Sequence, residues 1–191
     1  MKKILLFLAV IFSLYVNGQQ TTDNRQSLTS DIGIIPSPQD VSYLTTGYFA
    51  LDESCVLLDN ENEEISRIIN VFKNDIQEIT GLDLEISKKT SKKKYVTFEL
   101  IRPSSFLNYD SLTNIQILRI NQGYNIIIKD KFIHVSASTP QGLFYGAQSL
   151  KQLIRHQLLT ENNLNIPCYE IFDYPSLEYR GWMDDISRGP I

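Results

Sequence analysis

The sequence is poor in the residues that build disulfide scaffolds and metal centres. Its 191 residues include two cysteines and two histidines, which excludes a framework of several disulfides. His134 is interpreted as a strand residue and His156 as a residue near a helix end. Neither belongs to a metal-ligand spacing, and the sequence has no phosphate-binding loop and no Ser-His-Asp signature. We therefore expect no bound metal and no cofactor.

The two cysteines, Cys55 and Cys168, each lie among apolar residues. Export from the cell would permit a disulfide between them. Their spacing, however, does not establish the geometry that such a bond needs. Two buried free thiols are the preferred interpretation, and a Cys55–Cys168 bridge is the alternative.

The sequence also lacks a basic stripe. Its formal net charge is −4, which argues against nucleic acid or an anionic membrane as the main partner. The lysine cluster from Lys88 to Lys94 is interpreted as a solvated turn, with a phosphate or anionic-glycan patch as the alternative. The composition, with 42% hydrophobic and 21% charged residues, is that of an ordinary globular protein.

The N-terminus has the layout of a secretory signal peptide. A lysine pair precedes the apolar run 4–16, which is shorter than the ~20 residues of a membrane span. The small residue Gly18 suits cleavage before Gln19. We expect loss of residues 1–18 and a secreted or periplasmic protein without membrane contact; a retained anchor is the alternative. Polar residues 19–32 are expected to form a flexible lead-in.

Periodic patterns predict an α+β domain over residues 33–174. Apolar residues at spacings of three and four predict one helix over 62–80, ended by Gly81. A second helix is predicted to begin at Thr139-Pro140, because Thr can cap free amides and Pro needs no donor there. Strands are predicted over 47–51, 55–58, 82–86, 95–100, 124–128, 132–136 and 166–172. The expected fold is a mainly antiparallel sheet with two helices on one face.

The last dozen residues concentrate charge beside apolar residues. The pattern is typical of a strand with charged side chains near its ends, and these are Arg180, Asp184, Asp185 and Arg188. Carboxylates and guanidinium groups suit sugar hydroxyls, which they bind through charge-assisted hydrogen bonds. A structural ion-pair network is the alternative. We interpret the sequence as a fragment in which a catalytic domain has only begun.

Three segments of the sequence form a set: Ile34-Ile35-Pro36-Ser37-Pro38, the helix from Gly142 to Leu153 with its Gly-x-x-Tyr-Gly-x-Gln pattern, and the stretch from Ile166 to Gly181. Together they resemble glycoside hydrolase family 20, the β-N-acetylhexosaminidases. The resemblance implies that residues 33–174 form the N-terminal α+β domain. It also implies that residues 175–191 are the truncated start of a (β/α)₈ TIM barrel.

The resemblance further implies removal of terminal N-acetylglucosamine or N-acetylgalactosamine from glycans with retention. In this family the substrate's own acetamido oxygen is the nucleophile, a Glu is the acid and an adjacent Asp orients the acetamido group. Both would lie beyond Ile191, so no catalytic residue is expected in this chain. Arg180 matches the family Arg that binds sugar hydroxyls, while Asp185, Arg188 and Asp184 are expected to support the site.

The sequence departs from the family pattern at a few positions. Asp184 replaces an apolar residue, Gly189-Pro190 replaces His-Phe, and Ser176 replaces an Arg. Two alternatives to the hexosaminidase therefore stay open. The domain could be a carbohydrate-binding or interaction module. It could also be the same accessory domain of another barrel glycosidase, such as a hyaluronidase-like β-N-acetylglucosaminidase or an α-glucuronidase.

Overall fold

The computed structural model describes residues 32–89, 94–101 and 112–177. The predicted signal peptide, most of the predicted lead-in and the residues from 178 onward lie outside the described residues. Ten elements follow one another along the described chain: β1 Asp40–Ala50, β2 Val56–Leu58, α2 Glu63–Thr80, β3 Glu85–Ser87, β4 Tyr95–Leu100, α3 Asn114–Gln122, β5 Tyr124–Lys129, β6 Phe132–Ala137, α4 Pro140–Glu161 and β7 Asn165–Asp173.

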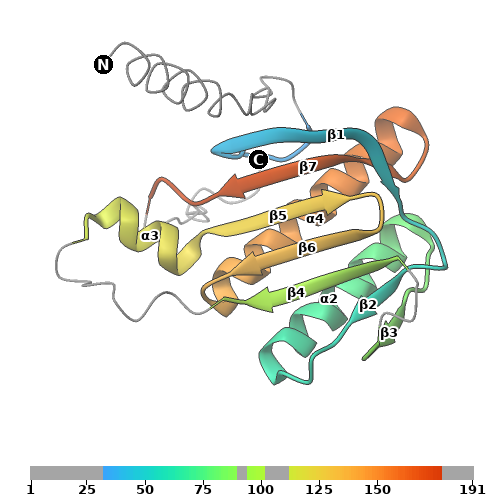
Figure 1. Ribbon diagram of the computed structural model, residues 1–191, viewed down its shortest axis with the longest axis horizontal. Coiled ribbons are helices and arrows are strands. Elements are labelled where there is room, and N and C mark those ends of the chain that lie inside the picture. Colours follow the sequence, from blue (N-terminus) through green and yellow to red (C-terminus); the bar gives the residue numbers. More distant parts are fainter. Residues whose placement is uncertain (1–31, 90–93, 102–111, 178–191) are drawn as a thin grey trace, which may run out of the picture.

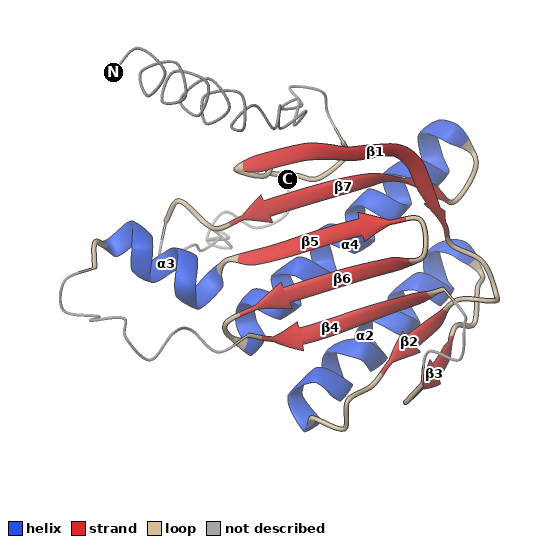
Figure 2. Cartoon of the chain, in the orientation of Figure 1, coloured by secondary structure: helices blue, strands red, loops and turns tan. Residues whose placement is uncertain are grey.

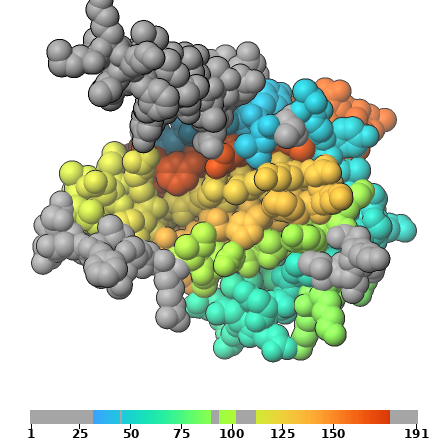
Figure 3. All heavy atoms as spheres, in the orientation of Figure 1, coloured from blue at the N-terminus to red at the C-terminus, as the bar shows by residue number. Residues whose placement is uncertain are grey.

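The described strands form one seven-stranded sheet in the order β1-β7-β5-β6-β4-β2-β3. In Figures 1 and 2 the helices α2 and α4 lie together behind this sheet. The predicted α+β class and the two helices on one face are therefore confirmed. Figure 3 shows the opposite face, where atoms of β5 and β6 reach the surface.

The sheet has an antiparallel half and a parallel half. The strands β1, β7, β5 and β6 pair antiparallel, including the predicted β5–β6 hairpin. The pairs β6–β4, β4–β2 and β2–β3 are parallel, which the sequence patterns did not predict. For β2–β3 the reason is α2, which carries the chain from the end of β2 back to the starting edge of β3, as a parallel crossover requires.

Helix α2 ends at the predicted Gly81, and its first turn is capped by Asn62. The Asn62 side chain accepts hydrogen bonds from the amides of Glu64 and Ile65, at 3.0 and 3.1 Å, which satisfies two free donors. Gly81 ends the helix with φ at 78°, a left-handed conformation that favours glycine. The buried face consists of Ile65, Ile68, Ile69, Phe72 and Ile76.

Helix α4 packs closely on the sheet because two of its residues lack side chains. The Thr139 hydroxyl caps the helix by accepting from the Gly142 amide at 3.1 Å. A β-carbon at Gly142 would lie 2.5 Å from the Gly123 carbonyl oxygen, and one at Gly146 would lie 2.7 Å from a Val135 methyl. These two glycines therefore let α4 approach the sheet closely.

The short helix α3 was not predicted. Its N-terminus carries a capping box in which the Thr113 hydroxyl accepts from the Gln116 amide and the Gln116 side chain accepts from the Thr113 amide. This Thr-x-x-Gln signal was present in the sequence. The helix buries only Leu118, so its apolar periodicity is too weak to mark it.

Candidate functional site

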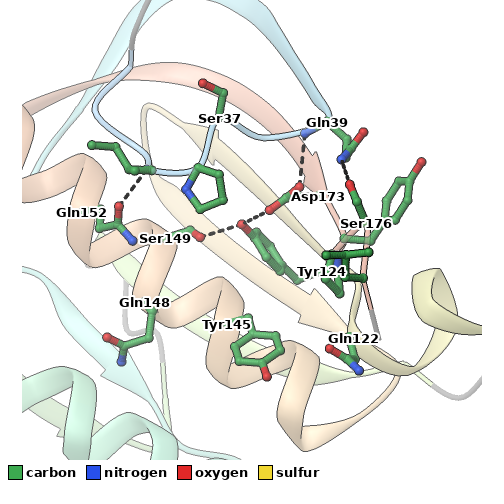
Figure 4. A pocket seen from close by; sticks show the side chains of 15 residues that line it. Ser37, Gln39, Gln122, Tyr124, Tyr145, Gln148, Ser149, Gln152, Asp173 and Ser176 are labelled. Carbon is green, nitrogen blue, oxygen red and sulfur yellow. Dashed lines mark hydrogen bonds between the residues drawn. The ribbon is translucent and has the colours of Figure 1, made fainter. Parts of the chain in front are cut away.

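A hollow of about 430 Å³ opens between the two ends of the domain. Its walls come from the N-terminal segment (residues 32–39), the start of β5, the first half of α4 and the C-terminal segment (residues 173–177). Figure 4 shows its side chains, which are mainly amides, hydroxyls and tyrosine rings. Asp173 is the one acidic residue among them.

A buried chain of hydroxyls crosses the floor of this hollow. The Tyr124 hydroxyl donates to Asp173 Oδ2 at 2.8 Å and lies 2.5 Å from Ser149 Oγ. Because the single tyrosine proton is used toward Asp173, Ser149 donates to the tyrosine oxygen. Burial is the main cause that raises the Tyr124 pKa far above its ordinary value. Tyr124 therefore stays protonated, and its hydroxyl is a fixed hydrogen-bond donor to Asp173.

Asp173 also ties the two ends of the domain together. Its Oδ1 accepts from the Gln39 amide at 3.2 Å, while the Gln39 side chain donates to Ser176 Oγ at 3.3 Å. On α4, Gln152 Oε1 accepts from the Ile35 amide at 2.8 Å. We call the set Gln39, Tyr124, Ser149, Gln152 and Asp173 the terminal clamp. It joins residues up to 134 positions apart in sequence.

A ring contact fixes the C-terminal segment from the other side. The Arg119 guanidinium of α3 lies 4.6 Å from the centre of the Tyr174 ring and 5.4 Å from that of Phe172. Such cation–π contacts contribute about 0.5–1 kcal/mol at exposed positions. The direction in which the chain leaves β7 is therefore set by α3 as well as by the terminal clamp.

The terminal clamp has the chemistry of a binding or positioning site. Ser149 faces a tyrosine hydroxyl with a raised pKa, which cannot act as a base to activate it. Over the described residues, no group of three or more His, Cys, Asp or Glu could hold a metal ion. In the same part of the chain no helix is long and apolar enough to span a membrane.

The sequence contains one adjacent Asp-Glu pair, Asp52-Glu53, and its Asp already has structural partners. The pair lies in the turn between β1 and β2. Lys94 donates to Asp52 at 2.7 Å. This hydrogen bond, followed by one from Ser54, lowers the Asp52 pKa to about 2. Asp52 is therefore engaged in contacts within the turn, and it is not free to orient a substrate group.

We expect Lys94→Met to weaken the protein slightly at neutral pH and to change its acid response. The Asp52 pKa is lowered in the folded state, so its ion pair stabilises the fold above pH 3.8 and this stabilisation is lost as the pH falls toward 2. Because Lys94 and Asp52 side chains are 30% and 47% exposed, the loss at neutral pH should be at most about 1 kcal/mol. Urea unfolding at several pH values measures it. The control Lys131→Met should behave like wild type, and a difference that stays constant down to pH 2 would contradict the assignment.

The four predicted site residues Arg180, Asp184, Asp185 and Arg188 lie outside the described residues. The described chain stops at Leu177, and the terminal clamp holds the segment that leads to them.

The remaining predicted residues have structural roles. His134 lies on β6, with Nε2 3.3 Å from Glu99 Oε2. His156 lies on α4, where a side chain at Gly33 would collide with its imidazole. Cys55 and Cys168 are buried free thiols, which was the preferred interpretation over a disulfide between them.

Sequence reasoning missed the terminal clamp. Its members come from the N-terminal segment, β5, α4 and β7, so no local motif contains them. One signal was present, since Tyr145, Gln148, Ser149 and Gln152 repeat at spacings of three and four along α4. This polar stripe runs beside the apolar stripe of the helix and lines the hollow.

Comparison with known proteins gives three informative similarities. The β-hexosaminidase of Porphyromonas gingivalis is 22% identical over 161 residues, which cover 82% of this chain and 19% of that protein. A β-hexosaminidase of Streptomyces plicatus in complex with GlcNAc superposes with a TM-score of 0.60 at 16% identity, covering 81% of this chain and 28% of that one. The structure of CpGH84D superposes with a TM-score of 0.58 at 20% identity, covering 78% and 25%.

These coverages show that the chain spans less than a third of each of these relatives. The family model described as glycosyl hydrolase family 20, domain 2, matches residues 31–174. That match begins at the N-terminal segment and ends beside Asp173, so it includes both ends that the terminal clamp joins. The chain therefore belongs to glycosyl hydrolase family 20 and contains domain 2 of that family.

Proposed function

We propose that this chain is the N-terminal, non-catalytic part of a secreted β-N-acetylhexosaminidase. The enzyme would remove terminal N-acetylglucosamine or N-acetylgalactosamine from glycans. The observation that carries this proposal is the match of residues 31–174 to domain 2 of family 20. Relatives named β-hexosaminidase support it. Because the chain spans only part of those relatives, the activity is proposed for the whole protein.

The proposed reaction proceeds with retention and with help from the substrate. The acetamido oxygen attacks the anomeric carbon, a Glu protonates the leaving oxygen, and an adjacent Asp orients the acetamido group. By resemblance, both carboxylates belong to a later strand of the barrel. The Asp52-Glu53 turn does not supply them, since Asp52 already accepts hydrogen bonds from Lys94 and from the Ser54 amide. We expect the 191-residue chain to be inactive by itself and to need no cofactor.

The role proposed for this chain is to hold and aim the start of the barrel. Arg180 follows the described C-terminal segment by three residues, and its planar guanidinium can bind two neighbouring hydroxyls of the terminal sugar. Asp184, Asp185 and Arg188 would brace that guanidinium and the strand end. The terminal clamp fixes Asp173 and Ser176, so the strand bearing Arg180 would start from a defined position.

We expect Arg180→Lys to lower kcat/KM by about 10- to 100-fold in the whole protein, as translated from its natural gene. A lysine makes point contacts and cannot reproduce the paired hydrogen bonds, each worth about 1.5–3 kcal/mol when charged. Release of nitrophenol from nitrophenyl N-acetyl-β-D-glucosaminide measures the effect. The control Arg155→Lys, at an exposed position of α4, should match wild type. Equal kcat/KM for Arg180→Lys and wild type would remove Arg180 from the site.

Secretion is part of the same proposal. It rests on the sequence of the first 18 residues, with their lysine pair, apolar run and Gly18. The mature protein would begin at Gln19 and meet its glycans outside the cytoplasm.

A second candidate is the same domain joined to another barrel glycosidase. The similarity to CpGH84D favours it, since that structure shares the fold at a TM-score of 0.58. The coding sequence downstream of Ile191 separates the two candidates. A family 20 barrel must supply an adjacent Asp-Glu pair, and a barrel without one would favour the second candidate.

A further inference from the structure

A second pocket lies on the face of the sheet that α2 and α4 leave open. Tyr124 and Ile126 on β5 belong to the core, so the side chain of Asn125 between them points to the opposite face. The strand register places Ser136 and Phe172 directly beside Asn125. Together with α3, which lies at this end of the sheet (Figure 1), they enclose about 170 Å³. The side chains that decide its chemistry are Ile101, Arg119, Asn125, Ser136, Ser138 and Phe172.

One buried polar atom at this pocket lacks a hydrogen-bond partner. Asn125 Oδ1 is shielded from solvent, and the described residues provide no donor for it. Buried side-chain oxygens nearly always accept a hydrogen bond, because an unpaired one destabilises the fold. The placement of Asn125 is therefore explained if the pocket receives a group that carries an N–H or an O–H.

The charge at the pocket restricts the class of ligand further. The Arg119 guanidinium lies 5.4 Å from the centre of the Phe172 ring, and its positive charge disfavours a cation. No acidic side chain is among the described residues that line the pocket. An ionised group such as sulfate would suit Arg119, but it has no hydrogen to donate to the Asn125 oxygen. The pocket therefore fits a neutral group that has both a donor and an acceptor.

The acetamido group of an N-acetylated sugar has this combination. Its N–H can donate to Asn125 Oδ1, and its carbonyl oxygen can accept from Arg119. Its methyl group can pack against Ile101, which is 50% exposed at the edge of the pocket. The hydroxyls of Ser136 and Ser138 remain for the ring hydroxyls. The volume is below the ~300–1,000 Å³ of sites for drug-sized ligands, so one sugar residue is the largest ligand expected.

We infer that this pocket binds a single N-acetylated sugar residue through its acetamido group. The site holds a glycan on the N-terminal domain and carries out no reaction. The inference goes beyond the proposed function and does not depend on it, because binding here needs only the described domain. Asn125 and Arg119 are the two residues that recognise the ligand.

The test titrates the 191-residue chain with N-acetylglucosamine and follows the amide NMR signals of the pocket residues. We expect saturable binding with a Kd of about 1 mM, an ordinary value for so small a ligand. Glucose, which lacks the acetamido group, should bind at least about tenfold more weakly. Asn125→Val should weaken binding of N-acetylglucosamine to a similar extent. The matched control Asn165→Val makes the same change on β7 outside the pocket and should bind like wild type.

Two further measurements keep the test independent of folding defects. Asn125→Val should unfold at the same temperature as wild type or higher, because it removes a buried acceptor that has no partner. Arg119 is an exposed side chain of α3, so Arg119→Gln should fold whatever the strand variant does. It should also weaken binding of the sugar about tenfold, while Arg155→Gln on α4 should not.

Several results would overturn the inference. They are the absence of saturable binding, equal affinity for glucose and N-acetylglucosamine, and equal binding by Asn125→Val and Asn165→Val. Sulfate that binds more tightly than the sugar would identify an anion site and would overturn it as well. Hydrolysis by the whole protein is a separate measurement. A domain that binds N-acetylglucosamine beside an inactive barrel would therefore count against the proposed function alone.

Discussion

Replacing Phe72 by alanine should lower the free energy of unfolding of the 191-residue chain by about 3–5 kcal/mol, the range for removing a buried aromatic ring. Phe72 is fully buried on α2, and its ring meets that of Phe98 on β4 edge to face, with centres 5.3 Å apart. This pair joins α2 to the parallel half of the sheet. Its loss therefore removes both apolar burial and a specific ring contact.

Urea unfolding followed by circular dichroism measures this effect. The neighbouring Val71→Ala is the control, because Val71 lies on the exposed side of the same helix. Its free energy of unfolding should stay within about 0.5 kcal/mol of wild type. A loss below about 1 kcal/mol for Phe72→Ala would show that α2 is not held to the sheet by this core.

The second large effect is expected at Gly142. Alanine is the better helix former by up to about 1 kcal/mol, yet Gly142→Ala should destabilise the protein by about 1–3 kcal/mol, as overpacking does. Its β-carbon would lie 2.5 Å from the Gly123 carbonyl oxygen and 3.2 Å from the Ala137 β-carbon. The first of these is a backbone atom, so α4 would have to move away from β5 and β6.

Two control variants isolate this steric effect. Arg155→Ala tests helix propensity at an exposed position of α4 and should be neutral or slightly stabilising. Gly81→Ala tests backbone conformation alone, because φ is 78° there and nothing lies within 4 Å of the new carbon. It should cost about 1–2 kcal/mol. A thermal unfolding temperature that is higher for Gly142→Ala than for wild type would contradict the close approach of α4.

Local signals explain which parts of the fold could be predicted from the sequence. Helix α2 was predictable because Asn62, Gly81 and the apolar spacing all act within one segment. The β5–β6 hairpin was predictable for the same reason, because a short polar turn separates two apolar runs. The parallel pairs β6–β4 and β4–β2 depend on which distant strands meet, and the strand patterns alone are the same for both directions.

The terminal clamp shows why the candidate site could not be predicted. Gln39, Tyr124, Ser149 and Asp173 are polar residues in four separate elements, and each looks ordinary in its own segment. Only the sheet order, which places β7 between β1 and β5, brings them together. The polar stripe on α4 was the one local trace of this arrangement. The charged residues around Arg180, which did stand out in the sequence, lie outside the described residues.

Substrate-assisted hydrolysis is tested most directly by asking whether the protein, as translated from its natural gene, needs the acetamido group of its substrate. Its rates should be compared on nitrophenyl N-acetyl-β-D-glucosaminide and on nitrophenyl β-D-glucoside, which lacks the acetamido group. A substrate that carries its own nucleophile reacts many orders of magnitude faster than one that lacks it. We therefore expect the N-acetylglucosaminide to be hydrolysed at least about a hundredfold faster than the glucoside. Comparable rates on both substrates, or a preference for the glucoside, would contradict it.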